Sequence, residues 1–272
     1  MTIAVLVALV LYFLLPLWWL AVSSLKLYGV EFSGNPLWVS QPTLFNYVYA
    51  FTNASYYPLA RWLLNSVIES GFAGGLGALV AAMAGYALGK FRFRGRDAMT
   101  LLVAVALMVP STAIAFPIFV LEQQAGLVNT YQGVILPSSV SAFAAYFMTI
   151  YAAESIPKEV LDAARLDGAS EFRVFRSIAL RFFRPALITL FVLIFAGTWN
   201  NYLLPLFVLR DASLYMIPQG LSTVLINGST FPNLQFAIQV AGSAISVLFM
   251  VGLFVVCEKY IEAGLGLGAV KG

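Results

Sequence analysis

The fold is decided by the stretch SIPKEVLDAARLDGASEFRVFRSIALRFFRP, Ser155–Pro185, which lies between two long apolar runs. Its charged side chains are too costly to bury in hydrocarbon, so we expect the stretch to lie in water. Pro157 suits a first helical turn, and Lys158–Leu166 consists of good helix formers. Gly168 can take the left-handed conformation that ends a helix, and Ser170 can cap the next helix. The stretch therefore predicts a short helical hairpin outside the apolar body of the chain.

The second helix of this hairpin is expected to be amphipathic. A spacing of i, i+3, i+7 and i+10 places one set of apolar residues on a single helical face. This predicted apolar face consists of Phe172, Phe175, Ala179 and Phe182, while Arg173, Arg176 and Arg184 lie elsewhere around the helix. An aqueous hairpin that exposes aromatic rings needs a groove on a partner to bury them.

The composition indicates a membrane protein. The 272 residues are 61% hydrophobic and 10% charged, with a mean hydropathy of +0.89, whereas soluble domains contain about 25% charged residues. The chain has one cysteine, Cys257, and no histidine. This excludes an internal disulfide, a site with several cysteine ligands and any catalytic group that needs histidine. We therefore predict no catalytic residue, no metal site and no enzymatic activity in this chain.

Six stretches are long and apolar enough to cross a bilayer, which requires roughly 20 residues. They are residues 3–22, 63–88, 99–121, 132–152, 186–208 and 236–257. The predicted fold is an all-α polytopic membrane protein with six transmembrane helices. Pro110 and Pro117 interrupt the third stretch, and they predict either a packed kink, which we favour, or backbone that lines a cavity.

The distribution of basic residues predicts the orientation. Only Lys26, Arg61 and Arg210 of the 15 Lys and Arg lie outside residues 89–98, residues 153–185 and the tail after residue 257. Because cytoplasmic connectors carry the excess of Lys and Arg, these segments and both termini are expected in the cytoplasm. The basic connector at residues 90–97 is expected to lie near anionic lipid. The net charge of +3 then follows from topology and requires no nucleic-acid partner.

The second stretch contains polar side chains that are candidates for a substrate pathway. A carboxylate within a span is costly and usually faces a protein interior or an aqueous cavity. Glu69, with Asn65 one turn earlier on the same face, fits this pattern. The alternative is that Glu69 lies close enough to the outer interface to be solvated. Gly71 and Gly75 follow with the spacing that lets another helix approach closely.

Three further polar side chains, Trp199, Asn200 and Asn201, lie together in the fifth stretch. An aromatic face beside amide groups suits a sugar, which presents apolar C–H patches next to hydroxyls. The alternative is an interfacial aromatic belt with an amide bond between helices. Both readings stay open from the sequence alone.

The glycines of GYALGKF, Gly85–Phe91, do not form a phosphate-binding loop. Three residues rather than four separate the glycines, and Phe91 occupies the position where Ser or Thr would bind magnesium. We therefore expect this chain to bind no ATP and no other cofactor by itself.

Three motifs resemble a known family of transport proteins. The sequence DAARLDGA, Asp162–Ala169, resembles the EAA signature of the permease subunits of ABC importers, and the likeness continues through Phe175–Pro185. WNNYLLP, Trp199–Pro205, and the terminal GAVKG, Gly268–Gly272, resemble the carbohydrate-uptake branch of that family. The chain is thus similar to a permease with the type I ABC importer fold.

The resemblance implies a role for the hairpin and a set of partners. The hairpin at residues 155–185 would be a coupling helix that docks on a cytoplasmic ATPase, where ATP and Mg are bound. The implied partners are a second homologous permease subunit, two ATPase subunits, an extracytoplasmic sugar-binding protein and the sugar, in a bacterial or archaeal plasma membrane. Coupling is implied for Asp162, Ala163, Ala164, Asp167, Gly168, Ala169, Phe172 and Phe175, and a tail contact for Val270, Lys271 and Gly272.

The family pattern also implies a division of the chain. Residues 1–60 would form the first transmembrane helix and outer loop, residues 61–257 the permease core, and residues 258–272 the cytoplasmic tail. Two residues depart from the pattern, because Asp162 stands where the family has Glu and Arg181 stands where it usually has Pro. An alternative for Asp162 is a surface pair with Arg165, worth about 0.2–0.5 kcal/mol. The alternative function is an ion-coupled secondary transporter or channel that uses Glu69.

Overall fold

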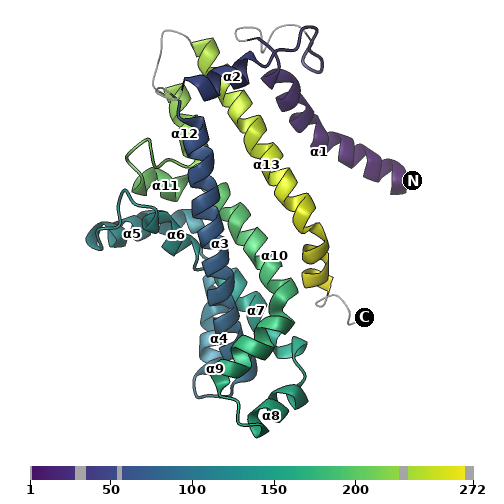
Figure 1. The fold of residues 1–272 in the computed structure, drawn as a ribbon, viewed down its shortest axis with the longest axis vertical. Coiled ribbons are helices and arrows are strands. Elements are labelled where there is room, and N and C mark those ends of the chain that lie inside the picture. Colours follow the sequence, from purple (N-terminus) through teal and green to yellow (C-terminus); the bar gives the residue numbers. More distant parts are fainter. Residues whose placement is uncertain (1, 28–34, 54–56, 227–231, 267–272) are drawn as a thin grey trace. The chain divides into compact units, whose positions relative to one another are not determined.

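The computed structural model describes residues 2–27, 35–53, 57–226 and 232–266, and the regular structure within these ranges is helical. The elements are α1 (Thr2–Ser24), α2 (Phe45–Thr52), α3 (Leu59–Lys90), α4 (Arg96–Ala106), α5 (Ser111–Gln124), α6 (Gln132–Ser138), α7 (Ala142–Ser155), α8 (Lys158–Leu166), α9 (Glu171–Val174), the π-helix η1 (Phe175–Ala179), α10 (Leu180–Trp199), α11 (Leu203–Val208), α12 (Ile217–Ile226) and α13 (Pro232–Gly266) (Figure 1). The expectation of an all-α fold is confirmed.

Six spans are present when each broken helix is taken as one crossing. Within the described ranges, four helical runs are long and apolar enough to span a membrane: α1, α3, the run from α9 to α10, and α13. Two helix pairs pass the same test together, namely α4 with α5, bent by 106°, and α6 with α7, bent by 41°. The number of predicted spans is therefore matched, but two of them are not straight.

The third span is broken, not kinked as we favoured from its sequence. Helix α4 ends at Ala106, and α5 begins at Ser111 after Pro110, whose backbone is extended with ψ 131°. Proline has no N–H to donate and disfavours a helical conformation in the residue before it, so α4 cannot continue through this position. Pro117 lies inside α5 without ending it. The predicted fifth span is also divided, because α10 ends at Trp199 and residues 203–208 form the separate helix α11.

The chain folds as two compact units, of which the first comprises the residues up to Asn65 together with Asp211–Gly252. Within it, the Asn46 side chain in α2 donates to the backbone carbonyls of Ser24, at 3.1 Å, and Lys26, at 2.7 Å. These bonds satisfy the Ser24 carbonyl, which has no partner within α1, and the Lys26 carbonyl just after the helix. The division predicted at residues 60 and 257 concerns family domains and stays a prediction.

The second unit comprises Ser66–Arg210 and the chain after Gly252, and it contains the hairpin. Its core joins α3, α7 and α10 through buried residues such as Tyr86, Met148 and Phe183. The helices approach closely at Gly85, which lies against Met148, and at Gly89, which lies against the Thr149 carbonyl. By contrast, nothing in the described chain lies within 4 Å of a Cβ built at Gly71 or Gly75. The predicted close approach thus occurs at other glycines of α3.

The hairpin forms as predicted up to the middle of its second helix. Helix α8 covers Lys158–Leu166, Gly168 has a left-handed φ of 79°, and the Ser170 hydroxyl accepts a bond from the Arg173 N–H at 3.4 Å. The π-helix η1 then adds one residue to the helical turn, which shifts the apolar face after it. As a result Phe183 is buried, while Phe182, expected on the same face as Phe175 and Ala179, is 39% exposed.

The second helix of the hairpin does not end at Arg181, where the family pattern placed a proline. Helical backbone runs without interruption from Glu171 to Trp199, with Pro185 inside α10. The second helix of the hairpin and the fifth span therefore form one continuous rod.

Candidate functional site

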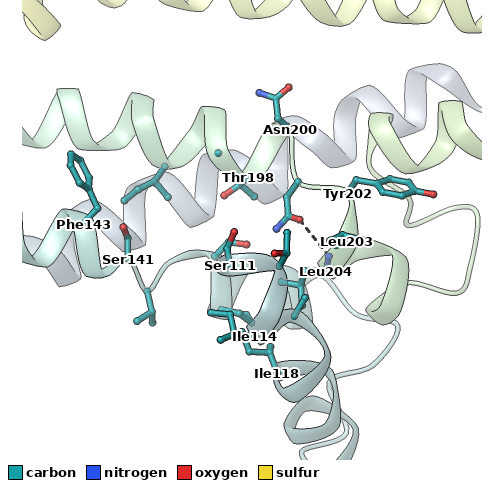
Figure 2. Close-up of a pocket in the computed structure, with 18 of the residues that line it drawn as sticks. Ser111, Ile114, Ile118, Ser141, Phe143, Thr198, Asn200, Tyr202, Leu203 and Leu204 are labelled. Carbon is teal, nitrogen blue, oxygen red and sulfur yellow. Dashed lines mark hydrogen bonds between the residues drawn. The ribbon is translucent and has the colours of Figure 1, made fainter. Parts of the chain in front are cut away.

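A cavity of about 570 Å³ lies inside the second unit where three broken helices meet. The start of α5 just after the break, residues 140–141 between α6 and α7, and the link at residues 200–202 between α10 and α11 all contribute to it. Figure 2 shows Ser111 on α5 beneath Thr198 on α10. Interrupted helices are tolerated at membrane depth where they are buried in protein or line an aqueous cavity, and they often form binding sites in transporters.

The lining of this cavity is polar but uncharged. It presents five hydroxyl side chains of Ser and Thr, two amides and one phenol against aliphatic walls and the ring of Phe143. The polar members are Ser111, Thr112, Ser138, Ser141, Thr198, Asn200, Asn201 and Tyr202. Such a surface can donate hydrogen bonds to a neutral polyol and accept them from it. It has no charged side chain that could form an ion pair with a charged polyol.

The polar groups of the lining differ in how far the chain itself satisfies them. The Ser141 hydroxyl caps α7 by accepting from the Ala144 N–H at 3.2 Å, and the Asn200 amide donates to the Ala196 carbonyl at 2.8 Å. The Asn201 side-chain oxygen accepts from the Leu204 N–H at 3.4 Å. The buried Ser138 hydroxyl has no hydrogen-bond partner in the described chain. A buried polar group without a partner is costly, and Ser138 is one of the residues that line the cavity.

The residues predicted for the substrate pathway are only partly brought together. Asn200 and Asn201 line the cavity, although Asn200 points away from Ser111 (Figure 2). Trp199 is 1% exposed and stacks on Phe195 with ring centroids 5.7 Å apart, so its ring belongs to the core and not to the lining.

Neither polar residue of the second predicted span lines the cavity. The Asn65 amide donates to the backbone carbonyls of Ser213, at 2.8 Å, and Tyr215, at 3.0 Å, and so holds the loop before α12. Glu69 is fully buried, which excludes a water-solvated position, and its oxygens have no hydrogen-bond partner in the described residues. Asn65 is therefore occupied in a structural role and does not share a cavity with Glu69.

The serines that line the cavity were not predicted as site residues from the sequence. Ser111 follows Pro110, and Ser138 and Ser141 belong to PSSVS, residues 137–141. A proline followed by serines within an apolar run was the available signal, because it marks a helix break whose freed backbone must be satisfied.

A second candidate site is the hairpin, whose elbow is held by an ion-pair network. The Arg165 Nε donates to Glu171 at 2.7 Å, across the turn from α8 to α9, and its Nη1 lies 3.4 Å from Asp162. The Tyr86 hydroxyl of α3 donates to the other Glu171 oxygen at 3.3 Å. The hydrogen bond that Arg165 donates to Glu171 raises the pKa of Arg165 above its usual value. Thus Asp162 does pair with Arg165, but Glu171 is the nearer partner.

The hairpin exposes two large apolar side chains at its tip. Leu166 is 89% exposed and Phe172 is 72% exposed, on either side of the exposed Gly168. Phe175 is half-buried and packs on the Tyr86 ring with centroids 5.3 Å apart, so it belongs to the core of this chain. Phe175 is therefore not exposed as we expected, and its role in coupling stays a prediction. Leu166 was not predicted, although it directly precedes the turn.

The remaining predicted coupling residues lie around the same elbow. Ala163 and Asp167 are exposed, and Ala164 and Ala169 are half-buried against the core. The predicted tail contact by Val270, Lys271 and Gly272 lies outside the described residues. Within the described ranges no group of three or more His, Cys, Asp or Glu side chains could hold a metal ion.

These features define the class of protein. A helical membrane protein whose broken spans surround an uncharged polar cavity, and whose hairpin stands outside those spans, is built as a transport protein. The chain matches the family described as "Binding-protein-dependent transport system inner membrane component" over residues 76–260, and it belongs to this family. It is therefore a membrane-embedded permease subunit of a binding-protein-dependent ABC importer. The ion-coupled alternative that used Glu69 is not favoured.

Similar proteins are found among curated permeases and solved structures. The chain is 40% identical over 230 residues to an arabinooligosaccharides transport system permease of Halalkalibacterium halodurans, covering 85% of this chain and 80% of that protein. It is 32% identical over 228 residues to a lactose transport system permease of Rhizobium radiobacter, covering 84% and 81%. A chain of a bacterial ABC transporter that imports the acidic polysaccharide alginate has the same fold, with a TM-score of 0.80 at 20% identity over 95% of this chain and 94% of that one.

Proposed function

We propose that this subunit lines part of the path of a neutral sugar or oligosaccharide and couples that path to a cytoplasmic ATPase. The observation that carries the proposal is the uncharged, hydroxyl-rich cavity at the meeting point of three broken helices. The names of the similar permeases support the substrate class, since they specify arabinooligosaccharides and lactose.

The chemistry of the cavity favours a sugar over an ion or an apolar solute. Ser138 offers a hydroxyl without a partner in the described chain, and Ser111 and Thr198 lie across the cavity from each other (Figure 2). Aliphatic walls and the ring of Phe143 match the C–H faces of a pyranose. An ionised solute would lose its hydration without gaining an ion pair from this lining, which is strongly unfavourable.

The hairpin is proposed to dock on the ATPase. Leu166 and Phe172 expose apolar surface beside an elbow, Gly168, that permits close approach, and burial in a groove would stabilise the complex. ATP and Mg would bind to the ATPase and not to this non-catalytic chain. The proposed assembly contains a second permease, two ATPase subunits and an external binding protein, with both termini of this chain in the cytoplasm and its tail, Val270–Gly272, against a partner.

Uptake of labelled arabinooligosaccharides and lactose by cells with and without this subunit tests the proposed substrate class. We expect uptake of at least one neutral sugar to depend on the subunit. Uptake that is unchanged for neutral sugars but lost for a uronate oligosaccharide would contradict the proposal.

Ser138→Ala tests the cavity itself and is expected to raise the KM for uptake by about 2–10-fold, the equivalent of one hydrogen bond. Because the Ser138 hydroxyl has no partner in the described chain, its loss should not lower the yield or the unfolding temperature of the protein. Ser139→Ala is the matched control, since the Ser139 hydroxyl donates to the Leu136 carbonyl at 2.7 Å and does not line the cavity. An equal change of KM in both variants would show that the effect is not local to the cavity.

Glu171→Gln is expected to lower transport per ATP hydrolysed several-fold while leaving the folded subunit and its bound ATPase in place. The Arg165–Glu171 pair is 36% and 45% exposed at its side chains, so solvent screening limits its contribution to stability to less than about 1 kcal/mol. It nevertheless fixes the angle of the elbow and, through Tyr86, joins it to α3. The charge swap Arg165→Glu with Glu171→Arg should recover part of the loss. A wild-type ratio of transport to hydrolysis in Glu171→Gln would contradict this role.

A further inference from the structure

Four arginines on the rod formed by α9, η1 and α10 have no role in the contacts described so far. Their side chains are exposed, and no described carboxylate forms an ion pair with any of them. They are Arg173, Arg176, Arg181 and Arg184, and together they are named the arginine stripe. Four unpaired guanidinium groups on one element repel each other, so the arrangement favours an anionic partner.

The π-helix narrows the arc of the rod that the four side chains occupy. In an uninterrupted α-helix of 3.6 residues per turn, Arg181 and Arg184 would lie about 80° and about 20° around from Arg173 on the side opposite to Arg176, so the four side chains would span about 140°. Because η1 accommodates one extra residue, the two later arginines take the positions i+7 and i+10 relative to Arg173. Those positions share a face with i and i+3. The same extra residue turns Phe183 into the core and leaves the arginines outside.

The position of the arginine stripe along the rod sets its depth in the membrane. Arg184 directly precedes Pro185, and residues 185–197 contain no charged side chain. The start of such an apolar run in a transmembrane helix lies at the boundary of the hydrocarbon, so Arg181 and Arg184 lie at the level of the lipid headgroups. Phe182 between them is 39% exposed and can rest its ring at the same interface.

We propose that the arginine stripe binds the phosphate groups of anionic phospholipid in the leaflet on the hairpin side. Guanidinium groups bind phosphate oxygens in a bidentate manner and are held at a membrane surface by its negative potential. Bound lipid would hold the rod at a fixed depth and angle. The placement in the cytoplasmic leaflet rests on the orientation proposed above, but the binding of anionic lipid does not.

The test uses the purified full-length chain in neutral detergent and measures its unfolding temperature. We expect short-chain phosphatidylglycerol to raise this temperature, and short-chain phosphatidylcholine or inorganic phosphate at the same concentration to leave it unchanged. Added salt should weaken the effect, since it screens charge. A shift produced equally by inorganic phosphate would mean that the arginines bind a free anion and would overturn the lipid proposal.

Two double variants, each of which removes two positive charges, show where on the chain the anionic lipid binds. Arg181→Gln with Arg184→Gln should abolish most of the shift caused by phosphatidylglycerol. Arg92→Gln with Arg94→Gln should keep most of it, because the exposed connector after α3 is expected to attract anionic lipid only by its general charge. Equal losses in both would indicate general charge attraction and would overturn the proposal. If the first variant kept the lipid shift but no longer retained the ATPase, the occupant of the arginine stripe would be the partner protein instead. Because the lipid measurement involves no transport, it can succeed or fail independently of the proposed function.

Discussion

Gly168→Trp is expected to abolish both transport and co-purification of an ATPase while the subunit still folds. Gly168 has a φ of 79°, which costs a side chain about 1–2 kcal/mol, and a Cβ there would meet nothing within 4 Å. The indole would therefore not disturb this chain but would project from the elbow between Leu166 and Phe172. A bulky ring at this point prevents the close approach that a groove on the ATPase requires.

The control for Gly168→Trp is Gly95→Trp, which imposes the same kind of strain elsewhere. Gly95 also has a left-handed φ, 90°, and open space around it, but it lies in the connector between α3 and α4. We expect Gly95→Trp to retain the ATPase and most of the transport. Gly168→Asn should also be tolerated, because asparagine adopts the left-handed conformation and is small. Co-purification of the ATPase with wild-type uptake in Gly168→Trp would refute the coupling role of the hairpin.

Most of the fold could be predicted from the sequence, because the residues that cross a membrane form long apolar runs that are easily recognised. Charged and apolar residues separate so sharply in this chain that six spans and one aqueous hairpin could be predicted from runs alone. The turn of the hairpin was equally accessible, since Gly168 and Ser170 have local conformational preferences that no tertiary contact overrides. These are properties of short segments, and short segments were predicted well.

Interruptions of helices could not be predicted with the same success. Pro110 and Pro117 both lie in the third span, yet only Pro110 ends a helix, because the outcome depends on whether neighbours satisfy the freed backbone groups. The π-helix at Phe175–Ala179 has no sequence signal that we recognise, and because of it Phe183 and not Phe182 continues the face of Ala179.

The residues of the candidate pathway were also hard to predict, because their positions depend on tertiary contacts. Polarity within a span was the reason for choosing Asn65, Glu69 and Trp199, but none of the three lines the cavity. Asn200 and Asn201 were found because they lie at a helix end, where backbone and side chains both face the cavity. A polar residue at a break in a helix is therefore better evidence for a pathway than a polar residue in an intact helix.

Gly85→Leu is expected to lower the unfolding temperature of the subunit strongly and to reduce its yield in membranes. A Cβ at Gly85 would lie 2.5 Å from the carbonyl carbon of Met148 and 2.6 Å from its oxygen. These are backbone atoms of α7 that cannot rotate away, so α3 and α7 would have to separate. Overpacking of this kind costs about 1–3 kcal/mol or more, which exceeds the gain of about 1 kcal/mol in helix propensity from replacing glycine.

Separation of α3 from α7 should also displace the hairpin. The Lys90 ammonium at the end of α3 donates to the carbonyls of Ala153, at 3.0 Å, and Ile156, at 2.8 Å, immediately before α8 begins. Any Gly85→Leu protein that does fold should therefore transport poorly. Gly75→Leu is the matched control in the same helix, because a Cβ at Gly75 meets nothing within 4 Å, and it should leave the unfolding temperature unchanged or raise it. Equal stability of the two variants, measured by circular dichroism on heating in detergent, would show that the contact at Gly85 does not hold these helices together.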